Sequence, residues 1–232
     1  MHHKFFSGEP SILMTYPINN MKPIPKSDLY TSNTTARLTL LAFEQVLGIN
    51  GIKSLLHHSG QDWLIDNYPP DNGNKEFDFS ELSMIYRSLE DIYGYKGAKG
   101  LSLRAGRAAF ANGLPDYKKF AGVTEVAIRA IPVSLRVGVM VKAVARVYNK
   151  TSDQQSSTRD TANKIIYTSH VCPVCYGRNV NAPACYVTAG VIQEALKWIT
   201  LGRMYTIIQT ACIGAGDAAC VYEIDKESMN KG

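Results

Sequence analysis

The protein has 232 residues, 45% of them hydrophobic, so the chain is long enough to bury a core of its own. Its 25 Lys and Arg outnumber its 20 Asp and Glu, which gives a formal net charge of +5. The basic residues are scattered and form no run of five or more, a pattern that argues against a nucleic-acid-binding protein. We therefore expect no nucleic-acid partner.

The amino-terminal half of the sequence reads as helices joined by short loops. Residues 1–30 contain several prolines and no sustained period, which predicts an irregular arm. Apolar residues recur at helical spacing in the segments that follow, and Ser32 offers a cap for the first of them. The predicted helices cover residues 32–48, 51–60, 78–94, 99–114 and 124–148. Gly48 ends the first, Gly106 indicates close packing of the helix at 99–114, and Pro132 should kink or split the last.

The carboxy-terminal half changes in character after residue 148. Residues 149–163 are polar and read as a loop, and residues 164–171 then read as a strand. Residues 185–202 are typical of a helix, and residues 204–212 and 219–224 of a terminal hairpin. The order predicts an α+β fold in which a helical half packs on a small antiparallel sheet with a C-terminal helix and hairpin.

We expect one domain over residues 31–225, with a helical part at 31–148, an α+β part at 160–225 and a tail at 226–232. The first ten residues, MHHKFFSGEP, lack the apolar core of a signal peptide, so we expect a cytoplasmic protein. The most apolar long stretch, residues 126–147, carries four basic residues, and we expect no transmembrane segment.

Two of the five cysteines lie in the predicted hairpin, whose turn we expect Asp217 to close. If the turn centres on Gly216, Cys212 stands directly opposite Cys220. Opposed residues have Cβ atoms about 4.5–5.5 Å apart. Two thiolates at that spacing can share one Zn²⁺ or form a disulfide. The pairing therefore predicts that the two sulfur atoms meet, and it leaves metal and disulfide open.

The other three cysteines precede the hairpin. Cys172 and Cys175 form a C-P-V-C pair, a spacing that suits a metal site or a redox dithiol. Cys185 opens the helix at 185–202, where the helix dipole stabilises a thiolate. His170 adds a candidate nitrogen ligand. A metal site, reduced structural thiols and a redox pair all fit these five cysteines.

Several of these features occur together in a known family. The relevant residues are Cys185, Gly190, LGR at 201–203, Cys212, GAGD at 214–217 and Cys220, together with the upstream helix LSLRAGRAAFANGL at 101–114. In this combination the chain resembles the 4-vinyl reductase, or hydrocarbon-binding, domain over roughly residues 100–224. The motif CPVCYGR is similar to one stand-alone bacterial branch of that family.

The resemblance implies a mixed α+β fold of the NO-signalling and Golgi-transport type, related to TRAPP vesicle-tethering subunits and often dimeric. In the family's phenol-sensing activators, three cysteines and a glutamate hold zinc beside an aromatic-ligand pocket. The three cysteines carry over onto Cys185, Cys212 and Cys220, but Gln209 stands at the glutamate position. A neutral amide is a poorer zinc ligand, so Cys172, Cys175 or His170 becomes a candidate for the fourth ligand.

Candidate ligand-binding residues complete the set. Aromatic side chains that could line a pocket are Tyr167, Tyr186 and Trp198, and Arg104 and Arg107 could hold an acidic ligand. At helix and strand spacing such aromatic residues are more often plain core, and such arginines more often cover a helix surface.

The sequence shows no hydrolytic triad, no H-E-x-x-H and no P-loop, so we favour a non-enzyme. The first hypothesis is a sensor or carrier of a hydrophobic or aromatic small molecule with a structural zinc site. It would act as a homodimer or through a separate signalling or biosynthetic protein. The alternatives are an enzyme or accessory of tetrapyrrole metabolism, a thiol-redox or iron–sulfur protein, and an interaction module without a pocket ligand.

Overall fold

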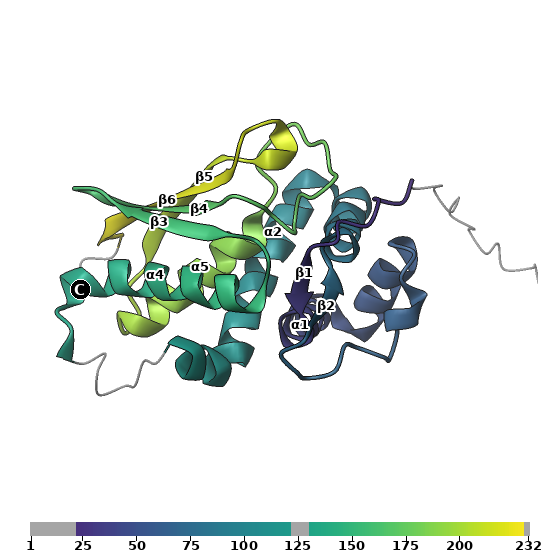
Figure 1. The fold of residues 1–232 in the computed structure, drawn as a ribbon, viewed down its shortest axis with the longest axis horizontal. Helices are drawn as coiled ribbons and strands as arrows, with labels where there is room; N and C mark the ends of the chain where they lie inside the picture. Colours follow the sequence, from purple (N-terminus) through teal and green to yellow (C-terminus); the bar gives the residue numbers. More distant parts are fainter. Residues whose placement is uncertain (1–21, 122–129, 230–232) are drawn as a thin grey trace, which may run out of the picture.

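The computed structural model of the protein describes residues 22–121 and 130–229 and has a helical amino-terminal half followed by an α+β half (Figure 1). This arrangement confirms the predicted α+β fold class. Most of the predicted arm and the start of the helix predicted at residue 124 lie outside the described residues. In chain order the elements are β1 (Tyr30–Ser32), α1 (Asn33–His58), η1 (Asp62–Leu64), β2 (Lys75–Asp78), α2 (Phe79–Ala121), α4 (Val133–Thr151), β3 (Ser156–Asp160), β4 (Lys164–Ser169), α5 (Tyr186–Ile199), β5 (Tyr205–Ala211), η2 (Ile213–Ala215) and β6 (Cys220–Ser228).

The main sheet has four antiparallel strands in the order β3-β4-β6-β5, and helices α4 and α5 lie against one of its faces (Figure 1). The predicted strand and terminal hairpin are present as β4, β5 and β6. Tyr167 on β4 stands opposite Tyr222 on β6, and their rings meet edge to face with centroids 5.7 Å apart. Both side chains are buried and form the centre of the sheet's inner layer.

The sequence prediction placed residues 149–163 in a polar loop, and this is wrong for residues 156–160, which form strand β3. Its sequence is SSTRD, and only Ser156 is buried. The strand forms because its backbone pairs along its whole length with β4, from Ser156 opposite Ser169 to Asp160 opposite Ile165. An exposed edge strand has little need of apolar side chains. Similarly, β6 continues to Ser228, beyond the predicted domain end at residue 225.

The helices of the amino-terminal half bend at two glycines. Gly48 in α1 has φ 76° and Gly94 in α2 has φ 67°, so each helix turns there and then resumes. The sequence predicts that the first helix ends at Gly48 and that a short helix follows at residues 51–60, which agrees with the non-helical backbone of Gly48 between the two helical parts of α1. The start of α1 is as predicted, since the Ser32 side chain accepts a hydrogen bond from the Thr35 amide at 3.2 Å.

The two halves are joined by a close crossing of α2 and α5. A Cβ atom added to Gly106 on α2 would overlap the carbonyl oxygen of Val187, and one added to Gly190 on α5 would overlap that of Leu103. The backbones therefore touch at a pair of glycines, as the sequence predicts for Gly106. This crossing fixes the start of α5, where one of the cysteines lies.

Helix α4 begins directly after Pro132, as expected for a proline that interrupts a helix, and residues 124–129 of the predicted helix lie outside the described residues. Within the described residues, no helix combines the length and the apolarity needed to cross a bilayer. Arg136 is buried in the first turns of α4 and donates a hydrogen bond to the carbonyl of Ile199, at the end of α5, at 3.3 Å. That contact joins the two helices beneath the sheet.

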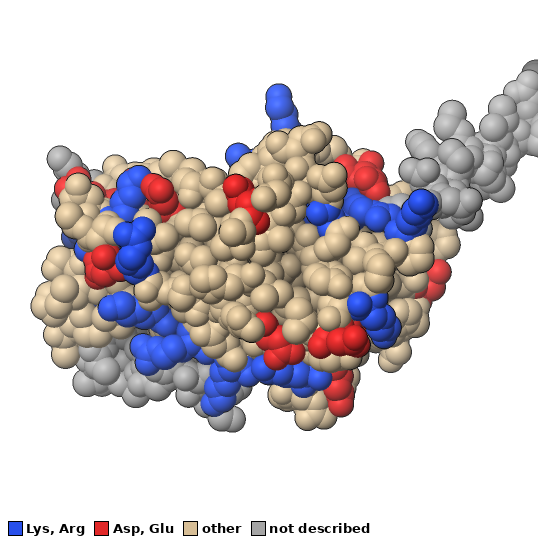
Figure 2. All heavy atoms as spheres, turned by 45° about the horizontal axis from the view of Figure 1, so that its top comes forward, with Lys and Arg blue, Asp and Glu red and all other residues tan. Residues whose placement is uncertain are grey.

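The surface shown in Figure 2 carries acidic and basic side chains close to one another, with a broad uncharged area between them. In the described part of the chain six lysine side chains pair with Asp or Glu at 2.5–3.8 Å, among them Lys53 with Asp66 and Lys75 with Asp153. This face therefore presents no continuous stripe of one charge.

The α2–α5 crossing generates a stability prediction. Gly106→Ala should lower the free energy of unfolding by about 1–3 kcal/mol or more, because the added methyl group has no space. Gly100→Ala is the matched control, since it lies in the same helix with no atom within 4 Å of the added Cβ. Alanine there should stabilise the helix by up to about 1 kcal/mol. Equal effects in urea unfolding would contradict the tight crossing.

Asp78 generates a second prediction. Burial raises the pKa of this carboxyl group, but hydrogen bonds from Ser80 and Ser27 outweigh burial and lower the pKa below its usual value. Asp28 also donates to it, and the Asp78 amide donates to Glu81, completing a capping box at the start of α2. Asp78→Ala should cost about 1–2 kcal/mol at pH 7.

The pH dependence of that cost follows from the sign of the shift. A carboxylate with a lowered pKa stabilises the folded state above its unfolded pKa of about 3.9 and loses that effect as the pH falls through the folded value. The difference in unfolding free energy between wild type and Asp78→Ala should therefore be constant near pH 7 and shrink below about pH 4. A difference that does not change with pH would contradict this role of the charged carboxylate.

Candidate metal centre and adjoining cavity

The five cysteines come from four separate segments and meet in one buried place. Cys172 and Cys175 lie on the loop after β4, Cys185 caps the start of α5, Cys212 follows β5, and Cys220 begins β6. All five are free thiols, and none is more than 4% exposed. The fold therefore gathers side chains that are up to 48 positions apart in the sequence (172 to 220).

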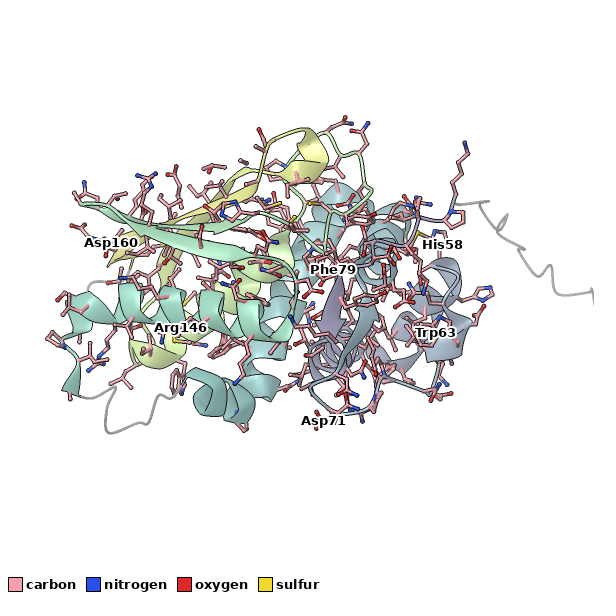
Figure 3. The ribbon with its side chains drawn as sticks, viewed as in Figure 1. His58, Trp63, Asp71, Phe79, Arg146 and Asp160 are labelled. Carbon is pink, nitrogen blue, oxygen red and sulfur yellow. The ribbon has the colours of Figure 1, made fainter. Side chains whose placement is uncertain are left out.

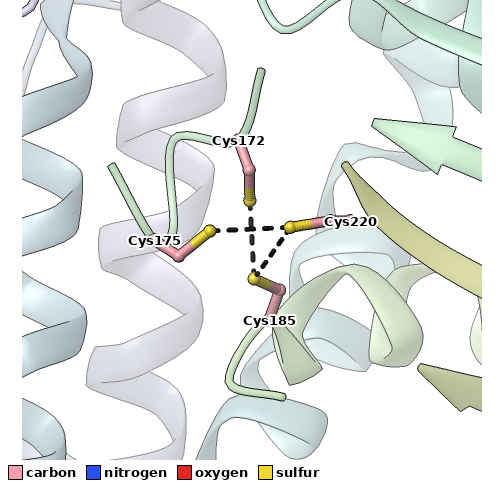
Figure 4. Close-up of side chains that lie close together, drawn as sticks. All are labelled: Cys172, Cys175, Cys185 and Cys220. Atoms are coloured by element: carbon pink, nitrogen blue, oxygen red, sulfur yellow. Dashed lines mark hydrogen bonds between the residues drawn. The ribbon is translucent and has the colours of Figure 1, made fainter. Parts of the chain in front are cut away.

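Four of the sulfur atoms form a compact set, which we call the four-sulfur group: Cys172, Cys175, Cys185 and Cys220 (Figure 4). All four lie within 4.8 Å of one another. The Sγ atom of Cys185 is 3.4 Å from that of Cys172 and 3.7 Å from that of Cys220, which is 3.5 Å from that of Cys175. Cys212 stands at the edge of the group, 3.9 Å from Cys185.

These separations suit one metal ion. Four thiolates around a tetrahedral Zn²⁺ at about 2.3 Å have sulfur atoms about 3.8 Å apart. An iron–sulfur cluster places several iron and sulfide ions between its cysteines and holds them farther apart. A mononuclear tetrathiolate site, with zinc or a single iron, is the chemistry that fits this donor set.

Gln209 stands where the 4-vinyl reductase family has a glutamate, and its side chain makes hydrogen bonds to the backbone. Its Oε1 atom accepts a hydrogen bond from the backbone amide of Cys185 at 3.0 Å, and its Nε2 atom donates to the carbonyl of Ala211 at 3.1 Å. The Oε1 bond joins the start of α5 to β5, and the Nε2 bond stays within β5, so both ends of the amide are engaged. His170 is exposed and hydrogen-bonds Ser157 at 2.9 Å, outside the cysteine cluster.

The predicted pairing of Cys212 with Cys220 is wrong in one respect. Ala211 pairs with Val221, but the strand ends there, with an irregularity between Gln209 and Ala211. Cys212 therefore precedes the helical turn η2 instead of standing in the ladder. Asp217 closes that turn, as predicted, by accepting a hydrogen bond from the Cys212 amide at 2.8 Å.

Mutual hydrogen bonding changes the ionisation of the sulfur atoms. Contacts from Cys175, Cys185 and Cys220 lower the pKa of Cys172. The pKa of Cys212 is lowered to about 6: contact with Cys175 raises it, but contacts with Cys185 and Cys220 outweigh that effect. Contacts with Cys172 and Cys175 raise the pKa of Cys185 and Cys220, so thiols of lowered and of raised pKa alternate in the cluster. Metal binding requires that the ligating cysteines be thiolates.

The loop that contains Cys172 and Cys175 is held against α2 by an ion pair and hydrogen bonds. Arg178 has a side chain only 2% exposed, lies 2.6 Å from the carboxylate of Glu90 on α2, and donates to the carbonyl of Val174 at 3.0 Å. Ser83 on α2 donates to the carbonyl of Tyr176 at 2.6 Å. These contacts fix the loop against the amino-terminal half.

A cavity of about 320 Å³ adjoins this loop. Its walls come from both halves of the fold, and Pro173 and Val174 of the C-P-V-C loop form part of them. The remaining lining residues come from β1, the start of α1, the 71–73 loop, α2, the end of α4 with Gln154 beyond it, and the start of α5. Volumes of about 300–1,000 Å³ are usual for small-molecule sites.

The ligand-binding candidates from the sequence lie outside the lining of this cavity. Tyr167 is in the core and hydrogen-bonds Gln154, and Trp198 packs on Phe110. The hydroxyl of Tyr186 is 2.8 Å from that of Tyr95. Arg104 is exposed, and Arg107 donates to the Gln193 side chain at 2.6 Å. Their role in ligand binding stays a prediction.

Residues 165–226, from β4 to β6, match the family model of the 4-vinyl reductase domain, and this stretch contains all five cysteines. The match confirms the resemblance stated from the sequence, over a little more than a quarter of the chain. No curated protein matches the sequence.

The fold is similar to solved structures of H-NOX proteins. A double variant of Tt H-NOX has a TM-score of 0.51 at 14% identity, covering 86% of this chain and 95% of that one. A structure described as giving insight into the molecular mechanism of H-NOX activation has a TM-score of 0.52 at 11% identity, covering 87% of this chain and 100% of that one. At these identities the likeness shows a shared fold.

The four-sulfur group generates a prediction about metal content. Cys172→Ser should reduce bound metal from near one ion per chain to near none in anaerobically purified protein, because a hydroxyl replaces a thiolate ligand. Cys212→Ser is the matched control and should retain the ion, since its sulfur lies outside the group. Elemental mass spectrometry measures both. Loss of the ion in Cys212→Ser with retention in Cys172→Ser would instead favour the ligand set that the family resemblance implies.

Proposed function

We propose that the protein is a sensor or carrier of a hydrophobic small molecule, and that a structural tetrathiolate zinc site shapes its binding cavity. The observation that carries this proposal is the double role of the C-P-V-C loop. Its two cysteines belong to the four-sulfur group, and the two residues between them, Pro173 and Val174, line the cavity. The metal site and the ligand site thus share one loop of four residues.

Zinc would add a cross-link between segments that are already joined by a few hydrogen bonds, among them that of Gln209 with the Cys185 amide. Cys185 is at the start of α5 and Cys220 at the start of β6, while Cys172 and Cys175 lie on the loop. One ion bound to all four would join the loop, the helix and the sheet at a single point. The Tyr222 hydroxyl already donates to the carbonyl of Cys185 at 2.9 Å, so the helix start is held in the geometry that such an ion requires.

A site with four protein ligands is closed, and it offers a bound ion no position for water or substrate. The proposal therefore assigns the metal a structural role and assigns the protein no catalytic step. It also disfavours a thiol-redox function, because attack on a disulfide requires an accessible thiolate. All five sulfur atoms are buried, with residue exposures of 0–4%.

We also propose that the protein works in a reducing compartment such as the cytoplasm, since five free thiols would be prone to oxidation elsewhere. Binding would be reported through a homodimer or through a separate signalling or biosynthetic protein. Both the dimer and the partner are parts of the proposal that rest on the resemblance to the 4-vinyl reductase domain.

A tetrapyrrole is the alternative ligand that this resemblance offers. Protein side chains that bind haem iron are His, Cys, Met or Tyr. In the described part of the chain, the cavity lining contains Tyr86 and Tyr148 but no His, Cys or Met. Burial, followed by the nearby Cys172 and Cys185, raises the pKa of Tyr86, which disfavours the phenolate that would bind iron. We therefore favour a smaller apolar ligand.

The coupling of metal and cavity can be tested with naphthalene as a fluorescent apolar probe. Removing the metal with a chelator should weaken naphthalene binding by about tenfold or more, because Val174 and Pro173 lose their support. Val191→Trp, which fills the cavity, should abolish binding while the metal content stays near one ion per chain. Unchanged binding after metal removal, or binding that survives Val191→Trp, would contradict the proposed function.

A further inference from the structure

The two edges of the main sheet differ in how they are protected. An edge strand presents unpaired backbone N–H and C=O groups, and proteins usually cover the edge or place charges on it. At the start of β3, the Asn149 side chain accepts a hydrogen bond from the Ser156 amide and donates one to the Ser156 carbonyl. Arg159 and Asp160 are exposed at the end of that strand, and Figure 3 shows Asp160 at the edge of the molecule. The β3 edge is therefore blocked at both ends.

Strand β5 forms the opposite edge of the sheet and lacks such protection. It pairs with β6 alone, and in the described part of the chain no backbone–backbone hydrogen bond reaches its other side. Its seven residues, YTIIQTA, include no charged residue and no proline. An edge strand of this kind is a template on which another strand can pair.

Exposed apolar side chains gather at the same edge. Among the described residues Leu201 is 78% exposed and Met229 is 63% exposed, the two highest values for large apolar side chains. Leu201 lies four residues before β5, and the Met229 amide donates to the carbonyl of Met204, directly before the strand, at 2.8 Å. Ile208, in the middle of β5, is 53% exposed. Apolar side chains that gather on a surface in this way mark an interaction site.

The sequence of β5 suits pairing with a second copy of itself. In an antiparallel pair centred on Ile208, this residue stands opposite its own counterpart, and Thr206 stands opposite Thr210. These three positions alternate with Tyr205 and Gln209, which are buried, so they share the outer face of the sheet. Because the strand is uncharged along its whole length, no like charges meet in this pairing.

Charged residues just beyond the strand favour the same arrangement. Arg203, two residues before β5, and Asp217, in the turn after it, are both exposed. The antiparallel pair directs position 203 of one copy towards positions 212 and 213 of the other, and Asp217 is held there by its hydrogen bond from the Cys212 amide. Each copy thus brings its Arg203 towards the other copy's Asp217, which gives two contacts of opposite charge that a strand of unrelated sequence would lack.

We propose that a second copy of the chain binds at β5, and that the two antiparallel β5 strands join two four-stranded sheets into one continuous sheet. The inference deepens the proposed function and rests on it, because it gives an interface to the homodimer through which ligand binding is reported. This interface adjoins the candidate metal centre, since Gln209 on β5 accepts the hydrogen bond from the Cys185 amide.

Opposite charges at position 208 test the proposal. Ile208→Lys and Ile208→Glu should each weaken the dimer by about tenfold or more, because each variant places two like charges opposite one another. An equimolar mixture of the two should form a heterodimer, since Lys then faces Glu. Ser157→Lys is the matched control, because it adds the same charge to an exposed position of the other edge strand, and its dimer should persist. Sedimentation velocity over a range of protein concentrations measures each dissociation constant.

A cysteine variant tests the register without adding charge. In the proposed pair the two Cβ atoms at position 208 are about 4.5–5.5 Å apart, which allows a disulfide between copies. Ile208→Cys should therefore give a covalent dimer after mild oxidation with diamide, seen on a non-reducing gel. Thr206→Cys is the control and should give none, since each Cys would face position 210 of the other copy.

The outcomes separate this interface from the rest of the proposed function. A wild type that stays monomeric at every concentration, a mixture of Ile208→Lys and Ile208→Glu that stays monomeric, or equal cross-linking of Ile208→Cys and Thr206→Cys would each overturn the interface. Metal content and naphthalene binding, measured on the same samples, should match those of the wild type, because Ile208 belongs to neither the four-sulfur group nor the cavity lining. A monomer that binds naphthalene would refute only the interface, whereas a dimer with charge rescue that binds no naphthalene would refute only the cavity's role.

Discussion

The constraint on which the carboxy-terminal half depends is electrostatic: several sulfur atoms that tend to ionise are buried together. Contacts among them lower the pKa of Cys172, and lower that of Cys175 to about 5 even though its contact with Cys172 raises it. Contacts with Cys172 and Cys175 raise the pKa of Cys185 and Cys220, because neighbouring thiolates and burial oppose further ionisation. Buried anions at these distances repel one another unless a cation lies between them. A metal ion at the centre of the four-sulfur group would remove that cost and turn repulsion into cross-links between the loop, α5 and β6. The close crossing of α2 and α5 at Gly106 and Gly190 joins this cross-linked region to the amino-terminal half, next to the cavity.

Much of the fold could be predicted because its signals are local. The Ser32 cap, the helix break at Pro132 and the terminal hairpin each follow from residue types within a few positions. Strand β3 could not be predicted, because its polar residues become a strand only through pairing with β4. The breaks at Gly48 and Gly94 fall where the predicted helices end, but the sequence did not show that each helix resumes directly after the glycine.

The candidate site was predictable in its chemistry but less so in its geometry. The clustering of the five cysteines followed from their spacing and from the family resemblance. Which four sulfur atoms lie closest together depended on the residue at which β5 ends. The strand ends at Ala211, one residue before Cys212, and Cys212 therefore lies at the edge of the cluster. The cavity could not be predicted, because its lining spans residues 31 to 191 and includes small and hydroxyl-bearing side chains in place of the aromatic residues chosen from the sequence.

The central claim is that one ion is held by four thiolates and by no other ligand. X-ray absorption at the metal edge of anaerobically purified protein measures this directly. The account predicts four sulfur scatterers at about 2.3 Å and no nitrogen or oxygen in the first coordination shell. Three sulfur scatterers with an oxygen or nitrogen ligand, or a second metal nearby, would contradict it.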